Sequence, residues 1–509
     1  MSTESLGKFM ENQKEVFQQT CTGYSGFIII QLIDKLAVTD VNTLQEYAKR
    51  QKLTGLAAVL EKWQPETRRA INSLSVSQIL ELERRAAAKR KKGKFWNWFQ
   101  SPKLQLPSLT RYWELDARKL DGKVDELLRE LNQLKEVDFA YKELAASDPA
   151  EVAPSDDKFF PTQGYLKPAI EGGIDAEFAW QFTQGGGVTF VDLERGWYTR
   201  STGVDGHQDL QAFTPTYHGG NNWVDDDYHG TAVLGIVAAN DNNFGVVGIA
   251  PGVTSVKLTS RYQAAGASHS KVANALAAVL PHLVPGDILL IEVQKSSMPI
   301  ERELLDFNAI RVAADLDIIV IEVGGNGGIS LDAADVGVID IIDGKERIRS
   351  LNRGSANFLD SGAIVVGASH SAFLADGQHR RLNSTGPEAK SNFGSRVDCY
   401  AWGENIATTS TMRGELGPSP APDKPVDPKS KYTNSFGGTS GAGAIIAGVA
   451  LLLQSRYHVK NSGARLLNFE APLKDMRTIL STRGTPSPDP IGVMPDLKRI
   501  FIELGLDIV

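Results

Sequence analysis

The segment Phe436-Gly437-Gly438-Thr439-Ser440-Gly441-Ala442-Gly443 runs directly into the apolar stretch Ala444–Leu453. The glycines predict a turn and the apolar run predicts a buried helix, so Ser440 is expected at a helix N-terminus. Backbone N–H groups and the helix dipole favour developing negative charge at such a position. Taken alone, however, the segment is better explained as an ordinary serine cap.

Short apolar strands alternate with helices from about residue 163 onward. The predicted strands cover residues 188–193, 255–258, 288–293, 318–323 and 363–366. The predicted helices cover residues 229–239, 271–283, 301–314 and 440–453. This alternation is typical of an α/β fold, with a parallel sheet covered by helices on both faces.

Two other segments carry ionisable side chains at positions where such a fold places ligands. Gly187-Val188-Thr189-Phe190-Val191-Asp192 is an apolar strand that ends in a carboxylate. His229 begins a helix of small apolar residues, which fixes the orientation of the imidazole and suits a general base. Considered singly, Asp192 is better explained as a solvated strand end or a helix cap. A lone histidine is usually structural, but the small residues that flank His229 let its helix pack closely below a site and favour a functional role.

The three residues are more informative together, because the chain order Asp192, His229, Ser440 is that of the subtilisin triad. The chain resembles the subtilisin-like serine peptidases (subtilases, peptidase family S8) over roughly residues 163–505. The resemblance is carried by two motifs, His229-Gly230-Thr231 with Val233 and Gly235, and Gly438-Thr439-Ser440 with Ala442 and Ala447-Gly448.

The resemblance implies acyl transfer on protein or peptide substrates, without a required cofactor. Ser440 is then the nucleophile, His229 the general base and Asp192 the carboxylate that orients the imidazole. Val323-Gly324-Gly325-Asn326-Gly327-Gly328 follows an apolar strand and resembles the family's oxyanion segment. The Asn326 amide and the Ser440 backbone N–H are therefore expected to stabilise the tetrahedral oxyanion.

The chain departs from the family pattern close to these motifs. Asp192 is followed by Leu193-Glu194, where the common pattern has a small residue and then glycine, and Ala444 stands where proline is usual. Neither change removes a catalytic atom, so activity is still expected. Glu194 places a bulky charge near the site and is expected to alter substrate choice.

The strand that usually lines the S1 subsite carries acidic and polar residues here. Glu292 and Gln294 replace the family's Ser and Gly, and Glu322 stands beside the opposite wall formed by Gly324 and Gly325. One hypothesis is an acidic subsite that accepts basic or polar P1 residues. The alternative, slightly favoured, is that these acids face away from the cleft and are solvated.

Residues 110–146 read as a small α+β unit. The pattern predicts a strand at 111–115, an amphipathic helix at 124–134 and a second strand at 136–141. The unit resembles the family's inhibitory propeptide, which implies a self-processing zymogen. Cleavage is then expected within residues 141–158, and the catalytic domain is expected to occupy residues 158–509.

Residues 1–100 are predicted to be a separate helical region of unknown role. They carry 16 basic and 10 acidic side chains, whereas the remaining 409 residues carry 38 and 51. The basic and aromatic segment 84–99 has three interpretations. It could bind a nucleic acid or an acidic membrane, or it could bind the acidic catalytic domain of the same chain. Alternatively, it is the end of a helix followed by a packed linker. The last reading is favoured, and a partner for residues 1–100 remains open.

Composition limits the remaining possibilities. The net charge of −7 makes nucleic acid an improbable partner for the whole chain. The sequence has only two cysteines, Cys21 and Cys399, and they lie far apart. This excludes a disulfide framework and a cysteine-based zinc site. Calcium is possible, but Asp225-Asp226-Asp227 has no recognisable ligand spacing. No signal peptide or membrane span is predicted, so cytoplasmic synthesis is expected, while export without a signal peptide stays open.

Three hypotheses from different classes follow. The leading one is an active subtilisin-type serine endopeptidase. A catalytically silent subtilase scaffold is a second, and the full set of Asp192, His229, Asn326 and Ser440 argues against it. The third makes residues 1–100 an adaptor that recruits the enzyme to a partner. A sedolisin-type peptidase is disfavoured because it has no need of the His229 motif.

Overall fold

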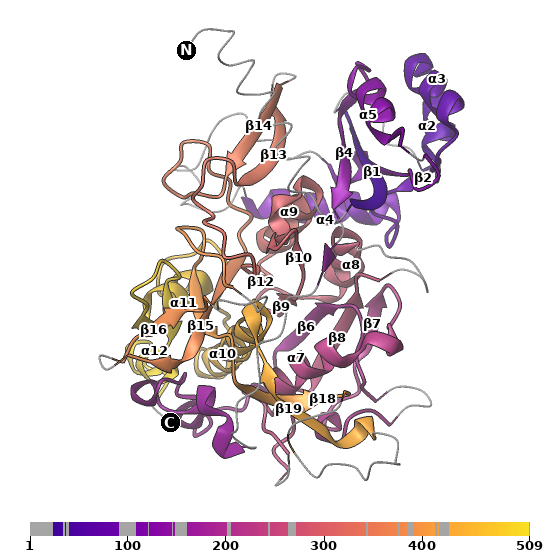
Figure 1. The fold of residues 1–509 in the computed structure, drawn as a ribbon. Helices are drawn as coiled ribbons and strands as arrows, with labels where there is room; N and C mark the ends of the chain where they lie inside the picture. Colours follow the sequence, from indigo (N-terminus) through magenta and orange to yellow (C-terminus); the bar gives the residue numbers. More distant parts are fainter. Residues whose placement is uncertain are drawn as a thin grey trace.

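The computed structural model separates into a small N-terminal unit and a larger α/β body (Figure 1). The larger body contains the predicted catalytic motifs. The structure describes residues 24–33, 36, 40–90, 108–120, 122–144, 146–147, 160–200, 205–242, 245–262, 271–342, 345–374, 377–383, 390–412, 416 and 427–507.

Within the described residues, the larger body is built on a ten-stranded sheet with the order β20-β21-β17-β15-β12-β9-β6-β8-β7, and β16 pairs with β15. The strands from β7 to β21 run parallel, whereas β20 and β16 are antiparallel edges. This confirms the predicted α/β fold. The strands are β6 (Thr189–Glu194), β7 (Thr216–Gly219), β8 (Ser255–Ser260), β9 (Ile288–Ile291), β12 (Ile319–Val323), β15 (Ile364–Phe373), β16 (His379–Arg381), β17 (Cys399–Trp402), β20 (Gly484–Pro486) and β21 (Val493–Pro495).

Helices cover both faces of this sheet. One face packs against α7 (Tyr228–Ala238) and α10 (Gly438–Lys460), and the other against α8 (Val272–Val279) and α9 (Leu304–Asp315). The smaller elements are α6 (Ala176–Ala179), α11 (Met476–Thr482), α12 (Leu497–Glu503), β10 (Gln294–Lys295), β11 (Met298–Pro299), the hairpin β13 (Gly337–Ile342) and β14 (Lys345–Ser350), and the pair β18 (Ile406–Ser410) and β19 (Lys431–Phe436).

The alternation of side chains along β6 decides which residues face the site. Phe190 packs with the α7 and α10 side of the sheet, and Val191 and Leu193 pack with the α8 and α9 side. Because successive strand residues point to opposite faces, Asp192 and Glu194 both project toward α7 and α10. The two carboxylates therefore share the face that carries His229 and Ser440.

The N-terminal unit contains a four-stranded sheet with the order β2-β3-β1-β4. It combines strands from both of the regions that the sequence analysis separated, so the predicted boundary between residues 1–100 and 110–146 is wrong. The predicted strands and helix of 110–146 are confirmed. The elements are β1 (Tyr24–Leu32), α2 (Leu44–Arg50), α3 (Thr54–Trp63), β2 (Glu66–Arg69), α4 (Val76–Arg90), β3 (Tyr112–Asp116), α5 (Val124–Asn132) and β4 (Val137–Leu144).

Strand β1 explains why the N-terminal region is not purely helical. Ile28 and Ile30 are buried with α2, α3 and α5, whereas Ile29 is buried on the other face, toward α8 and α9. A strand that is buried on both faces shows no polar alternation in its sequence. The apolar run 26–33 is therefore a central strand that joins the two parts of the unit.

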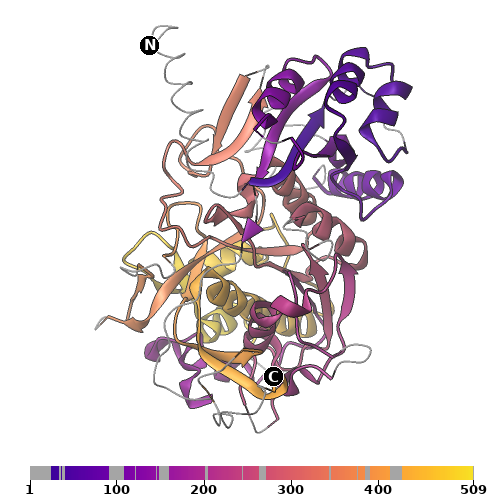
Figure 2. The same cartoon turned by 45° about the vertical axis from the view of Figure 1, so that its right-hand side comes forward.

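One helix of the described part, α10, is long and apolar enough to cross a membrane by length and composition. Its apolar window is entirely buried inside the molecule, as expected for the central helix of a globular core. Figure 2 shows α10 enclosed by the sheet and the surrounding elements.

Arg396 lies at the centre of a buried ion network. Its guanidinium donates to both carboxylate oxygens of Glu301 at 2.7 Å each, and to Asp398 at 3.0 Å. We expect Arg396→Met to lower the free energy of unfolding by about 3–5 kcal/mol, because Glu301 then stays buried without its counter-charge. Urea denaturation measures the change.

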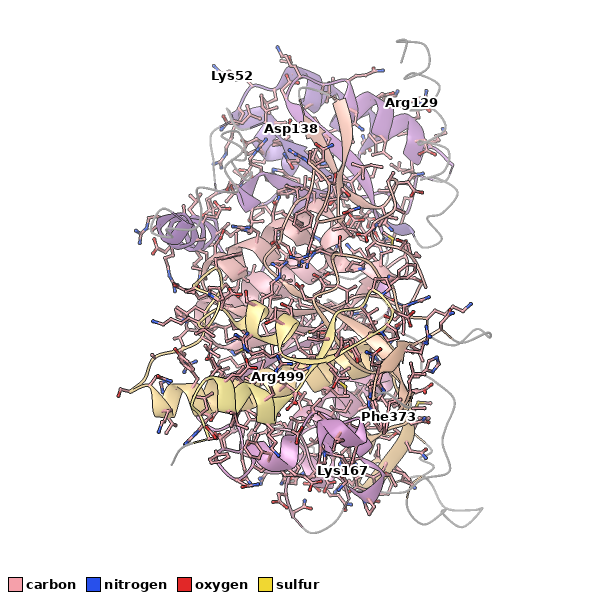
Figure 3. All side chains as sticks on the ribbon, turned by 90° about the vertical axis from the view of Figure 1, so that its left-hand side faces the viewer. Lys52, Arg129, Asp138, Lys167, Phe373 and Arg499 are labelled. Carbon is pink, nitrogen blue, oxygen red and sulfur yellow. The ribbon has the colours of Figure 1, made fainter. Side chains whose placement is uncertain are left out.

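The exposed Arg499 offers a matched control for this prediction. Its ion pair with Glu503 lies on the surface, where Figure 3 labels Arg499, and half of the Arg499 side chain is exposed. Arg499→Met is expected to change stability by less than about 1 kcal/mol. Equal effects of the two substitutions would contradict a structural role for the buried network.

Candidate active site

His229 lies in the first turn of α7 and is almost completely buried. Its Nδ1 atom is 2.5 Å from Oε2 of Glu194, which accepts the hydrogen bond. The second oxygen of that carboxylate accepts from the backbone N–H of Arg195 at 2.9 Å. The ring of Phe436 packs edge-on against the imidazole, with centroids 5.2 Å apart. These contacts fix the orientation of the imidazole.

Asp192, which the family resemblance implies as the carboxylate that orients the imidazole, makes no hydrogen bond to His229 within the described residues. Its Oδ2 accepts a hydrogen bond from the indole N–H of Trp197 at 2.7 Å. Burial, together with the charge of Glu194, raises the pKa of Asp192 well above its usual range. The physical reason for the difference is placement, because Glu194 lies one pleat further along β6 and carries a longer side chain.

Ser440 lies in the first turn of α10, as predicted, and is fully buried. The turn before it requires glycine at 438, where φ is +68°. The Ser440 hydroxyl has no hydrogen-bond partner among the described residues, so the Ser440–His229 hydrogen bond is not made in this state. Such bonds often tighten only when a substrate binds.

Asn326 follows β12 and is held against the segment that carries Ser440. Its side-chain oxygen accepts from the backbone N–H of Thr439 at 2.9 Å and from the Thr439 hydroxyl at 3.1 Å. Its own backbone N–H donates to Oε1 of Gln294 at 2.8 Å. The amide NH₂ has no partner among the described residues although it is buried. Asn326 therefore presents a fixed hydrogen-bond donor beside the N-terminus of α10.

The predicted substrate-binding residues lie on opposite faces of the sheet. Glu322 is fully buried, accepts from the backbone N–H of Glu301 at 2.8 Å and, by alternation with Ile321, faces away from α10. Burial raises the pKa of Glu322 well above its usual range. The predicted wall position of Glu322 is therefore wrong. Glu292 is also fully buried, so neither acid is solvated, contrary to the favoured alternative.

Glu292 lies on the same face of the sheet as Ser440. Its Oε1 is 3.1 Å from the point where a β-carbon on Gly443 would stand, one turn after Ser440. Gly324 and Gly325 pair their backbone N–H groups with Val366 and the Thr439 hydroxyl, at 2.8 and 3.2 Å. These contacts form the wall around Asn326, and the substrate roles of the wall residues stay predictions.

The acidic loop before α7 is engaged within the protein. Asp226 pairs with Arg195 at 2.8 Å, and Asp227 accepts from the hydroxyl of Thr411 at 2.7 Å. Across the described residues, no group of three or more His, Cys, Asp or Glu side chains is placed to hold a metal ion.

The end of the N-terminal unit reaches this site. Strand β5 (Ala146–Ser147) pairs antiparallel with β10, so that Ser147 lies opposite Gln294 and Ala146 opposite Lys295. Gln294 in turn contacts Asn326. A segment of the chain is thus added as an extra strand beside Asn326, which is how extended peptides bind at a sheet edge.

Comparisons with known proteins agree with this architecture. The family model described as the Subtilase family matches residues 150–464, which is more than half of the chain. Fervidolysin from Fervidobacterium pennivorans, a keratinolytic enzyme related to subtilisin, superposes with a TM-score of 0.54 at 15% identity, covering 94% of this chain and 61% of that one. The MycP3 protease of a type VII secretion system gives a TM-score of 0.44 at 17% identity, covering 70% and 92%. No curated protein matches the chain.

Proposed function

The chain belongs to the subtilase family, and from this premise we propose that it is a serine endopeptidase with Ser440 as nucleophile and His229 as general base. The observation that carries the proposal is the donor geometry of Asn326. The backbone N–H and the hydroxyl of Thr439 both donate to the side-chain oxygen of Asn326. The NH₂ group of Asn326 has no partner among the described residues and is available as a donor beside Ser440. A purely structural asparagine would be expected to use its buried donor.

The chemistry follows from these positions. Ser440 Oγ attacks the scissile carbonyl carbon, and its proton passes to Nε2 of His229. The Asn326 NH₂ and the Ser440 backbone N–H, at the N-terminus of α10, stabilise the resulting oxyanion. The C–N bond then breaks, and the leaving amine takes the proton from His229. Water repeats the sequence on the acyl-enzyme and releases the acid.

Cleavage of an unfolded protein substrate tests the endopeptidase proposal. The purified chain is incubated with reduced, alkylated carrier protein, and the products are identified by mass spectrometry. Internal fragments whose appearance is blocked by a serine-directed sulfonyl fluoride are expected. Products shortened only from one end, or cleavage that resists the reagent, would contradict a serine endopeptidase.

We also propose that the N-terminal unit is an inhibitory propeptide. It is packed on α8 and α9 through apolar side chains that share one core with these helices. Polar contacts cross the same interface, because Asn308 donates to the hydroxyl of Tyr112 at 2.8 Å, and the side-chain oxygen of Asn274 accepts from the backbone of Asn72 and Ser73.

A buried charge cluster joins the two parts at the same place. Lys271, just before α8, contacts Glu114 of β3 and Glu143 of β4, the latter at 3.0 Å. All three side chains are at least nine-tenths buried. Removing one partner of such a group leaves an uncompensated buried charge, so the cluster favours the docked state. Docking brings β5 onto β10, beside Asn326.

Self-processing is the expected consequence. Wild-type protein should lose its N-terminal unit by cleavage within the expected stretch 141–158, on the C-terminal side of Ser147, whereas Ser440→Ala should keep the full mass of 55.3 kDa. Intact-mass measurement over time, with hydrolysis of a peptide substrate followed in parallel, checks both. Full activity in a preparation that retains its N-terminus would contradict the propeptide role.

A further inference from the structure

We propose that Glu194, rather than Asp192, is the positioning residue that orients His229 and balances its charge. This inference rests on the proposed serine-peptidase function. It concerns only which of two neighbouring buried carboxylates is paired with the imidazole. The assignment follows from the contacts of the two side chains and from the residues that hold them.

The hydrogen bonds distinguish the two carboxylates directly. Glu194 Oε2 is 2.5 Å from Nδ1 of His229, and Glu194 itself is fully buried. The Arg195 backbone N–H, 2.9 Å from Glu194 Oε1, fixes the second oxygen of the same carboxylate. A carboxylate held in this way sets the tautomer of the imidazole and leaves Nε2 to accept the proton of Ser440.

Trp197 holds Asp192 out of the corresponding position. Its indole N–H donates to Asp192, while its backbone N–H and C=O both bind the side chain of Asn222, at 2.8 and 3.0 Å. A β-carbon on Gly230 would lie only 2.6 Å from the indole ring. Glycine after His229 thus lets the tryptophan pack against the first turn of α7 and reach Asp192.

Charge also favours a single ionised carboxylate. Asp192 and Glu194 lie two residues apart on one face of β6. Glu292 directly follows the neighbouring strand β9, and its backbone N–H donates to the Leu193 carbonyl at 3.2 Å. Several ionised carboxylates in one buried cluster repel one another. Burial and the charge of Glu194 raise the pKa of Asp192, which favours its neutral form, and Glu194 is the carboxylate in direct hydrogen-bond contact with the imidazole.

Nuclear magnetic resonance of the full chain tests this assignment without relying on activity. In a Ser440→Ala background, ¹⁵N-labelled histidine should show a strongly low-field Nδ1–H proton for His229. Glu194→Gln is expected to shift that proton upfield and to lower the pKa of His229. Asp192→Asn should preserve it, because the Asn oxygen still accepts from Trp197. Loss of the low-field proton in Asp192→Asn or Glu292→Gln, with its retention in Glu194→Gln, would overturn the proposal.

Peptide hydrolysis supplies a second readout. Each variant is first freed of its N-terminal unit by immobilised wild-type enzyme, and equal N-termini are verified by mass. We expect Glu194→Gln to lower kcat/KM by about 10³–10⁴-fold and to displace the acidic limb of its pH profile. Glu194→Asp should recover part of the loss, and Asp192→Asn should stay within about tenfold of wild type.

The outcomes separate the two proposals. A wild-type protein without peptidase activity refutes the proposed function, whatever the resonance shows. An active wild type in which Asp192→Asn loses more activity than Glu194→Gln refutes only the assignment to Glu194. Equal losses of activity in Glu194→Gln and Asp192→Asn, with no shift of the acidic limb of the pH profile in Glu194→Gln, also refute this assignment. A residue that positions His229 must change the pH at which His229 titrates.

Discussion

Replacing Ser440 with alanine is expected to lower kcat for peptide hydrolysis by about 10⁶-fold, because Ser440 is the group that forms the acyl-enzyme in the proposed mechanism. Ser440 is fully buried in the first turn of α10, and its hydroxyl is not used to hold the fold. The substitution should therefore leave the melting temperature nearly unchanged. Steady-state hydrolysis of a fluorogenic peptide, after removal of the N-terminal unit, measures the loss.

Ser435 provides the matched control, since it is a buried serine of β19 that lies just before the same motif. Its hydroxyl contacts that of Thr433 at 2.7 Å. Ser435→Ala is expected to reduce kcat by less than about tenfold, through a small loss of packing and hydrogen bonding. Comparable activity of Ser440→Ala and wild type would exclude Ser440 as the nucleophile.

Replacing Asn326 with alanine is expected to lower kcat by about 10²–10³-fold while KM changes little. In the proposed mechanism the amide NH₂ interacts with negative charge that develops only in the transition state, so its loss should affect the chemical step more than substrate binding. Separate measurement of kcat and KM on one peptide series distinguishes this pattern from a general loss of affinity.

Thr439→Val controls for the structural part of the Asn326 effect. This variant removes the hydroxyl that bonds to the Asn326 oxygen but keeps the Thr439 backbone N–H, which bonds to the same oxygen at 2.9 Å. We expect a loss of kcat no greater than about tenfold. A KM increase with unchanged kcat in Asn326→Ala would show that Asn326 binds substrate rather than the oxyanion.

The catalytic body was predictable from sequence because its signals are local. Apolar strands followed by helices predict the parallel sheet, and the observed β6, β9 and β12 lie within two residues of their expected bounds. The positions of His229 and Ser440 in the first turns of α7 and α10 also follow from short motifs. In each instance a few neighbouring residues determine the backbone.

The N-terminal unit was not predictable in the same way. Strand β1 pairs with β3 and β4, which lie more than 70 residues further along the chain. Its apolar run has the length of a strand, but periodicity alone cannot distinguish a strand buried on both faces from a buried helix segment. Only the tertiary pairing reveals that β1, β3 and β4 belong to one sheet.

The partner of His229 was missed for a related reason. The family pattern points to Asp192 and predicts for Glu194 only an influence on substrate choice. Strand alternation places both on one face, and that signal was available in the sequence. The choice between them depends on Trp197, whose contact with Asp192 arises from the fold around Asn222 and Gly230.

The most direct test of the central claim is reaction of the processed protein with a fluorophosphonate, followed by peptide mapping. An activated serine reacts with this reagent, whereas ordinary serines do not. We predict a single phosphonylated residue, Ser440, with no adduct in Ser440→Ala or in protein denatured before treatment. Peptide hydrolysis without an adduct, or an adduct on a different serine, would contradict the assignment of Ser440 as the nucleophile.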